Sequence, residues 1–77
     1  MDRLWLGYHG LHIPYDEVVA ILFYRSVLDT QIVRTYGRVP TGVCSVVVTV
    51  CGQYLPARWH TEQLRQRWTR WRLSQGE

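Results

Sequence analysis

The stretch Val43–Arg58 decides the fold, and it reads Val-Cys-Ser-Val-Val-Val-Thr-Val-Cys-Gly-Gln-Tyr-Leu-Pro-Ala-Arg. Branched side chains lose little freedom on a pleated surface, so residues 43–50 predict a strand. Gly52 supplies a turn, and residues 53–58 return as a second strand that closes at Pro56, where a ladder donor is lost. A hairpin alone is only marginally stable, so we expect the rest of the chain to cover it.

The two faces of the first strand differ in composition. The even positions are all apolar, whereas the odd positions are mixed: Cys44, Val46, Val48 and Val50 against Val43, Ser45, Val47 and Thr49. Successive side chains of a strand point to opposite faces. We therefore expect the even face in the core and the odd face as a partly covered surface, available for contacts between copies through Val43, Ser45 and Val47.

Before the hairpin, short apolar runs predict further strands. Residues 4–6 and 11–13 read as two short strands, and residues 17–24, seven of them apolar in a row, read as a strand covered on both faces. A helix over residues 17–24 stays open as an alternative, because Asp16 is a suitable cap. Residues 31–36 alternate and predict an edge strand with Arg34 facing outward, and residues 37–42 form a loop rich in Gly and Pro.

A helix is expected after the hairpin, over about residues 61–73, with Thr61 as N-cap. Three apolar residues recur at helical spacing and share one face: Leu64, Trp68 and Trp71. Arg65 and Arg72 flank this face on one side, with Arg67 and Arg70 on the other. The sequence thus predicts one α+β domain over residues 1–77, with about five short, mostly antiparallel strands and a C-terminal helix.

The small size of the chain favours self-association. A domain of 77 residues buries only about 60% of its extended-chain surface, so its core is thin. Cys44 and Cys51 are seven residues apart and fall on opposite faces of a straight strand, which argues against a mutual disulfide. His9 and His12 have no further clustered ligands, so we expect no metal and no cofactor. Association with copies of itself is the remaining route to a larger core.

Enzymatic and membrane functions find no support in the sequence. It contains no nucleophile elbow, Walker loop, dinucleotide fingerprint or zincin motif, so we expect a protein that is not an enzyme. It also contains no apolar run of membrane-spanning length and no recognisable N-terminal signal. We therefore expect a cytoplasmic protein without membrane association.

Charge divides the chain into two parts. Residues 31–77 carry seven arginines against two glutamates, a net charge of +5, whereas residues 1–30 carry two arginines against four acids, a net charge of −2. All nine basic residues are arginines. The guanidinium fork suits bidentate phosphate contacts, which favours a nucleic-acid partner, but coding bias in the source genome explains the same preference equally well.

Three segments, in this order, resemble the small bacterial RemA/RemB family, regulators of extracellular matrix genes. The first is Leu6-Gly7 followed by Ile13-Pro14-Tyr15-Asp16-Glu17-Val18-Val19-Ala20-Ile21. The second is Thr35-Tyr36-Gly37-Arg38, which is identical to a motif of the RemA branch. The third runs from Val46-Val47-Val48-Thr49 through Gln53-Tyr54-Leu55-Pro56 to Thr61-Glu62-Gln63-Leu64.

The resemblance implies a DNA-binding regulator of matrix and biofilm genes that assembles into a ring, with Arg38 as a DNA contact. The chain departs from the family at three places. Glu17 and Val39 stand where the RemA branch has basic residues, and the segment between residues 22 and 34 is shorter than the family's, which contains a helix.

Two main hypotheses follow. In the first, the chain is a homo-oligomeric, non-enzymatic DNA-binding transcriptional regulator whose phosphate contacts are Arg34, Arg38, Arg65, Arg67, Arg70 and Arg72. In the second, it is an oligomeric structural or protein-interaction module that has lost DNA binding, with the odd strand face and the two helix tryptophans, Trp68 and Trp71, as contact surfaces. A third interpretation, stacking of single-stranded bases on Trp59, Trp68 or Trp71, requires those rings to be exposed.

Overall fold

The predicted hairpin forms the middle of the molecule in the computed structural model, which describes residues 2–75. Strands β4 (Ser45–Thr49) and β5 (Tyr54–Ala57) pair antiparallel, from Ser45↔Ala57 to Val48↔Tyr54. β3 (Val18–Phe23) pairs antiparallel with the other side of β4, giving the strand order β3-β4-β5. A separate two-stranded sheet joins β1 (Arg3–Trp5) to β2 (His12–Pro14). The predicted α+β class is confirmed.

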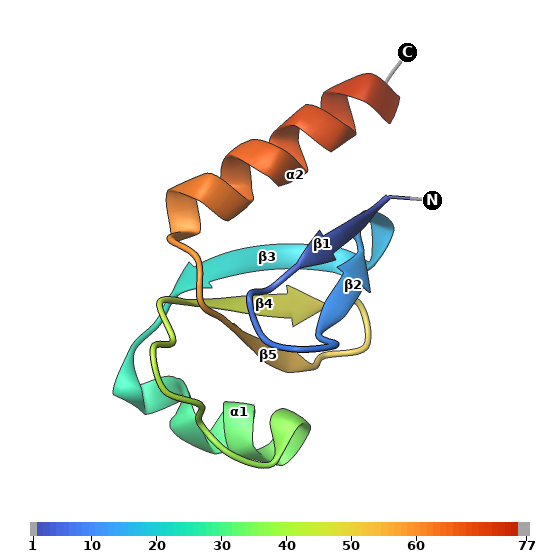
Figure 1. Cartoon of the computed structure of the whole chain (residues 1–77). Helices are drawn as coiled ribbons and strands as arrows, with labels where there is room; N and C mark the ends of the chain where they lie inside the picture. The colour runs from blue at the N-terminus through green and yellow to red at the C-terminus, as the bar shows by residue number, and fades with distance from the viewer. Residues whose placement is uncertain (1, 76–77) are drawn as a thin grey trace.

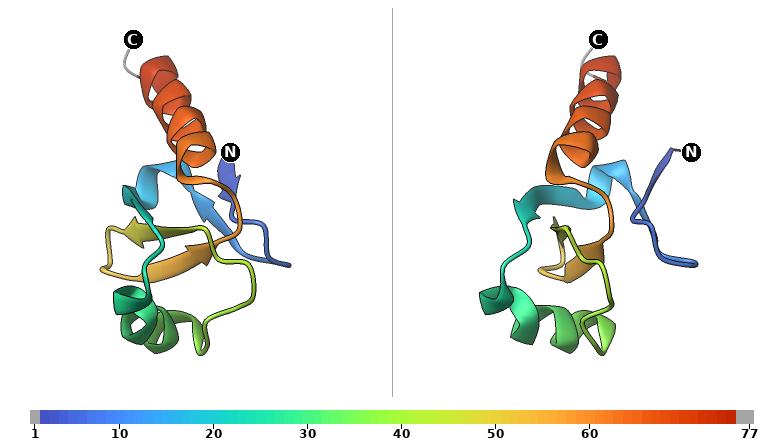
Figure 2. Two further views of the ribbon diagram at one scale, coloured as in Figure 1. Left: turned by 90° about the vertical axis from the view of Figure 1, so that its left-hand side faces the viewer. Right: turned by 60° about the vertical axis from the view of Figure 1, so that its left-hand side comes forward.

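Helices lie on both sides of the three-stranded sheet (Figure 1). α2 (Thr61–Gln75) and the β1-β2 sheet cover one face, and α1 (Asp29–Tyr36) lies at the other (Figures 1 and 2). Two short 3-10 turns, η1 (Tyr15–Glu17) and η2 (Ser26–Leu28), connect β2 to β3 and β3 to α1. The main core lies between the sheet, β1-β2 and the first turns of α2, and its fully buried members include Leu4, Leu6, Val47, Ala57 and Leu64.

The prediction that the odd face of β4 is only partly covered is wrong. Ser45 and Val47 have no exposed surface and Thr49 is only 3% exposed, because the odd face looks into the main core. Val46, on the even face, is fully buried as well. The β1-β2 sheet and α2 cover the odd face of β4 and α1 lies at the even face, so in this fold Ser45 and Val47 offer no surface to another copy.

The strand over Val18–Phe23 forms as expected, and the helix alternative is wrong, but the strand lies at an edge of the sheet rather than inside it. Val19 is 53% exposed and Phe23 is 59% exposed. The pairing with β4 shifts register between Val18 and Ala20, which is the irregularity of a β-bulge. The continuous apolar run therefore does not correspond to a strand covered on both faces.

The edge strand expected over residues 31–36 is wrong, because this segment is helix α1. The Tyr24 hydroxyl donates to Asp29 Oδ1 over 2.5 Å and so ties the first residue of α1 to the end of β3. Gly37 ends the helix at φ 98° and donates its N–H to the Val33 carbonyl, a left-handed C-cap that glycine adopts without a steric penalty. A single buried apolar residue, Ile32, anchors the helix.

Gly7 lets the chain after β1 pass directly over the end of β5. The Arg58 N–H donates to the Leu6 carbonyl over 2.8 Å, which brings the two backbones together. A Cβ on Gly7 would lie 2.6 Å from Arg58 Cβ and 3.2 Å from Trp59 Nε1, and the residue has φ 95°. Only glycine fits here without displacing the β5–α2 junction.

We expect Gly7→Ala to lower the free energy of unfolding by roughly 2–4 kcal/mol, because it adds a steric clash to a left-handed backbone penalty. Gly10→Ala is the matched control, since Gly10 also has positive φ, 73°, but a Cβ there meets nothing within 4 Å. We expect the control to cost only about 1 kcal/mol. Urea unfolding of both variants measures the difference, and equal losses would contradict the close approach.

A buried hydroxyl pair fixes the start of α2. Ser45 Oγ lies 2.6 Å from the Trp59 carbonyl and 2.9 Å from Thr61 Oγ1. The carbonyl can only accept, so the Ser45 proton goes to it and the Thr61 hydroxyl donates to Ser45. Both residues are almost fully buried, at 0% and 2% exposed. Because Ser45 is in the central strand, this chain of hydrogen bonds locks the β5–α2 connection onto the sheet.

We expect Ser45→Ala and Thr61→Ala each to cost roughly 1–3 kcal/mol of unfolding free energy, because each leaves a buried polar partner unsatisfied. The double variant should cost less than the sum, since it removes both hydroxyls together. Denaturant unfolding of the four proteins completes the double-mutant cycle. If the losses of unfolding free energy were additive, the two hydroxyls would act independently, which would contradict the hydrogen bond between them.

Candidate nucleic-acid interface

All nine arginines belong to the described residues, and all are exposed. Within residues 2–75 the only ion pair joins Arg65 to Glu62, with Nη1 and Oε2 4.0 Å apart. A pair at this distance between exposed groups contributes little to stability. The other guanidinium groups are therefore available to an external anion.

The predicted DNA contacts divide between two layers of the molecule. Arg34 lies in α1 and Arg38 just after it, whereas Arg65, Arg67, Arg70 and Arg72 belong to α2. The sheet separates the two helices (Figures 1 and 2). One copy of the chain thus presents two arginine groups rather than a single row of six.

Of the first group, Arg38 belongs to a loop cluster that it forms with Tyr8, Tyr36 and Arg58, whereas Arg34 lies outside this cluster on α1. The Tyr8 and Tyr36 ring centres are 6.4 Å apart, and the Tyr8 hydroxyl donates to the Thr41 carbonyl over 3.0 Å. Burial raises the pKa of Tyr8 above its ordinary value, and the positive charges of Arg58 and Arg38 act in the opposite direction. The sequence analysis missed Arg58, because the return strand gave no reason to place it beside the Tyr-Gly-Arg loop.

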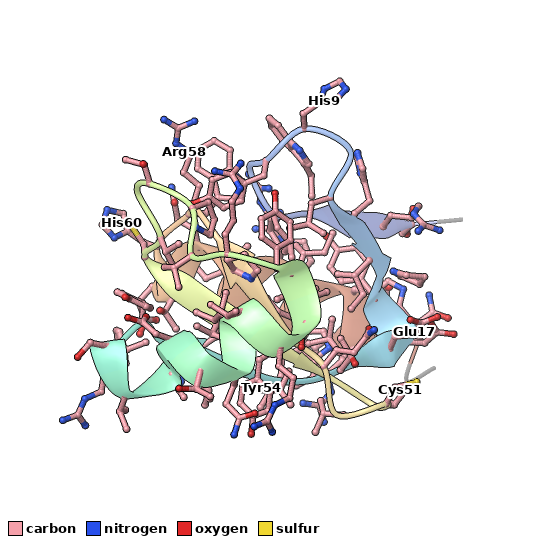
Figure 3. The ribbon with its side chains drawn as sticks, turned by 90° about the horizontal axis from the view of Figure 1, so that it is seen from below. His9, Glu17, Cys51, Tyr54, Arg58 and His60 are labelled. Atoms are coloured by element: carbon pink, nitrogen blue, oxygen red, sulfur yellow. The ribbon has the colours of Figure 1, made fainter. Side chains whose placement is uncertain are left out.

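Arg58 and Glu17 lie on opposite sides of the molecule as seen from below. Figure 3 shows Arg58 and His60 on one side of this view and Glu17 and Cys51 on the other. The Val50 N–H donates to the Glu17 carbonyl over 2.9 Å, which fixes Glu17 next to the β4–β5 turn. The carboxylate of Glu17 therefore does not neutralise the loop cluster.

Arg65 has a role within the fold. Its Nη2 and Nε donate to the Ile21 carbonyl over 2.9 and 3.3 Å, and its guanidinium lies 5.5 Å from the centre of the Phe23 ring. The Tyr24 N–H pairs with the Cys44 carbonyl, so Ile21 and Phe23 turn their backbone groups to the open side of β3. Arg65 thus caps the exposed edge of the sheet, a known protection against unwanted strand pairing.

The predicted contact tryptophans are only partly accessible. Trp68 is half-buried against the main core and carries Arg72 over its ring, with the guanidinium 5.1 Å from the ring centre. Trp71 stacks on Tyr15, with ring centres 5.6 Å apart and planes inclined by 14°. Val43 is partly exposed in the loop before β4. Of the predicted interface residues, these three retain some surface.

A second group of arginines surrounds a hollow between the start of β1 and the distal half of α2. Arg67 and Arg70 line it from the helix and Arg3 lines it from β1. The remaining lining residues are Asp2, Tyr15, Trp71 and Ser74. The sequence analysis missed Arg3, because it lies in the acidic part of the chain and only the fold brings it beside the basic helix.

The described residues show neither a metal-binding cluster nor a membrane span. No group of three or more His, Cys, Asp or Glu side chains gathers among residues 2–75, and Cys44 and Cys51 are both free. Across the same residues, no helix has the length and apolar character that crossing a membrane requires.

Comparisons with protein-family models, curated proteins and solved structures gave no match to this chain.

We expect Arg65→Met to lower the free energy of unfolding by roughly 1–3 kcal/mol, because it leaves the Ile21 carbonyl without its charged donor. Arg67→Met is the matched control on the same helix, since Arg67 makes no hydrogen bond to the described residues. We expect that control to stay within about 0.5 kcal/mol of the parent. Urea unfolding compares the two, and equal effects would contradict a structural role for Arg65.

Proposed function

We propose that this protein is a cytoplasmic, non-enzymatic DNA-binding transcriptional regulator that acts as a homo-oligomer, as its resemblance to the RemA/RemB family implies. One observation carries the proposal. Residues 31–77 hold seven exposed arginines, and among the described residues only Arg65 pairs with a carboxylate. Exposed, unpaired guanidinium groups on a basic surface favour a polyanionic partner, and DNA phosphates match their geometry.

Oligomerisation supplies what one copy lacks. A single loop cluster offers two arginines, Arg38 and Arg58, which would bind phosphate weakly and without base discrimination. In a ring, once one copy has bound DNA, the phosphate contacts of the other copies become intramolecular. The affinity of the whole ring for DNA is therefore higher than that of one copy. The phosphate backbone would supply most of the binding energy, with modest base readout.

One feature of the fold supports the proposal. α1 occupies Asp29–Tyr36 directly before Gly37-Arg38, and the family, with a longer segment there, also carries a helix before its Tyr-Gly-Arg loop. Gly37, as the C-cap, places Arg38 on the exposed side of the α1–β4 loop. This arrangement supports Arg38 as a phosphate contact.

A second candidate function is an oligomeric structural or protein-interaction module. The exposed apolar side chains of β3 favour it, because Val19 is 53% exposed and Phe23 is 59% exposed. Exposed apolar and aromatic side chains of this kind serve as anchors in protein interfaces. Val39, in place of the family's second arginine, also agrees with a surface that contacts protein rather than phosphate.

We expect a mobility-shift assay at low salt to show a complex between duplex DNA and an oligomer whose mass is measured on the same sample. Arg38→Ala should lower the affinity of the oligomer for duplex DNA by about tenfold or more, because every copy loses a phosphate contact. Arg25→Ala is the control, since it removes the same charge from the linker before α1. An oligomer that ignores DNA at low salt would overturn the proposal and favour the protein-interaction module.

A further inference from the structure

We propose that the hollow between β1 and the distal half of α2 is a binding site for the phosphate group of a nucleotide, held by Arg3, Arg67 and Arg70. This site is separate from the loop cluster, because none of its lining residues belongs to that cluster. The distal half of α2 also lies far from helix α1 (Figure 1). The inference goes beyond the proposed function, because the phosphate can come from a free nucleotide as well as from the DNA backbone.

The charges around the hollow favour an anion. Three guanidinium groups and one carboxylate, that of Asp2, line it, which leaves a net charge of +2. No carboxylate of the described residues lies within 4.0 Å of Arg3, Arg67 or Arg70, so these like charges gain nothing from ion pairs within residues 2–75. Like charges gathered on one surface repel each other, and a bound anion relieves this repulsion.

The wall of the hollow is already ordered. Trp71 stacks on Tyr15 and so fixes the distal half of α2 against the turn η1. The Ser74 hydroxyl donates to the Trp71 carbonyl over 2.7 Å, so its proton stays within the helix and the donors that face the hollow are the guanidinium groups. Arg67 and Arg70 are three residues apart on α2, so they project from neighbouring positions on one side of the helix. The backbone around the site is therefore fixed, and the ordering cost of binding falls on the three exposed arginine side chains.

Size and donor geometry favour phosphate over a smaller planar anion. The hollow has a volume of about 420 Å³, within the range of roughly 300–1,000 Å³ that small-ligand sites occupy. A phosphate monoester offers three oxygen atoms, which three guanidinium forks approaching from two elements can share. A carboxylate carries one negative charge, whereas a phosphate monoester carries about −1.5 to −2 at neutral pH and so matches the net charge of +2 around the hollow more closely.

Titrations with adenosine 5′-monophosphate, adenosine and a short DNA duplex, followed through the arginine Nε–H signals in nuclear magnetic resonance spectra, test the site. We expect the monophosphate to shift the signals of Arg3, Arg67 and Arg70, and adenosine to leave them unchanged. Arg3→Gln should weaken monophosphate binding by about tenfold or more, because it removes a charged fork. Asp2→Asn should strengthen it a few-fold, because it removes the one negative charge of the lining.

Arg25→Gln is the control, since it lowers the net charge equally at a distant linker, and we expect unchanged affinity. The site proposal is overturned if the monophosphate leaves the three signals in place, or if Arg3→Gln and Arg25→Gln weaken binding equally. If the monophosphate binds at these arginines but the duplex does not bind at all, the site stands and the DNA-binding proposal fails. If the duplex binds and shifts only Arg34 and Arg38, while the monophosphate shifts none, the site fails and the DNA-binding proposal stands.

Discussion

The buried hydrogen bonds of Ser45 hold the arrangement together. Ser45 lies in the central strand, donates to the Trp59 carbonyl and accepts from Thr61, so one hydroxyl connects the sheet to the start of α2. A hydroxyl without partners would be costly at zero exposure, so these hydrogen bonds favour the fold in which α2 leaves the sheet at this point. The direction of α2, and with it the position of its arginines beside β1, follows from this constraint.

The position of α2 determines what each arginine can do. Near the start of the helix, Arg65 turns back to the Ile21 carbonyl and protects the edge of β3. Farther along, where the Tyr15–Trp71 stack holds the helix, Arg67 and Arg70 meet Arg3 around a hollow. The arginines of α2 thus differ in role, because each turn of the helix lies beside a different part of the fold.

The sequence predicted the hairpin, the other strands and the C-terminal helix, because β-branched runs and the i, i+4, i+7 spacing carry local signals. It failed for residues 31–36, where the Tyr24–Asp29 hydrogen bond and the Gly37 cap favour a helix that alternation alone does not reveal. It also predicted the wrong buried face of β4. Ser45 is polar, and the buried hydrogen-bond partners that satisfy it in the core are not visible in the sequence. Arg3 and Arg58 joined the candidate sites only through tertiary contacts between distant segments.

The central claim is that the loop clusters of several copies bind DNA phosphates together. It is tested most directly by the affinity for duplex DNA over a series of salt concentrations. Each neutralised phosphate contributes a slope of about −0.9 to the logarithm of affinity against the logarithm of salt concentration. The account predicts a straight line steeper than the slope of about −2 that the two arginines of one loop cluster could give. A flat response between low and near-physiological salt would contradict it.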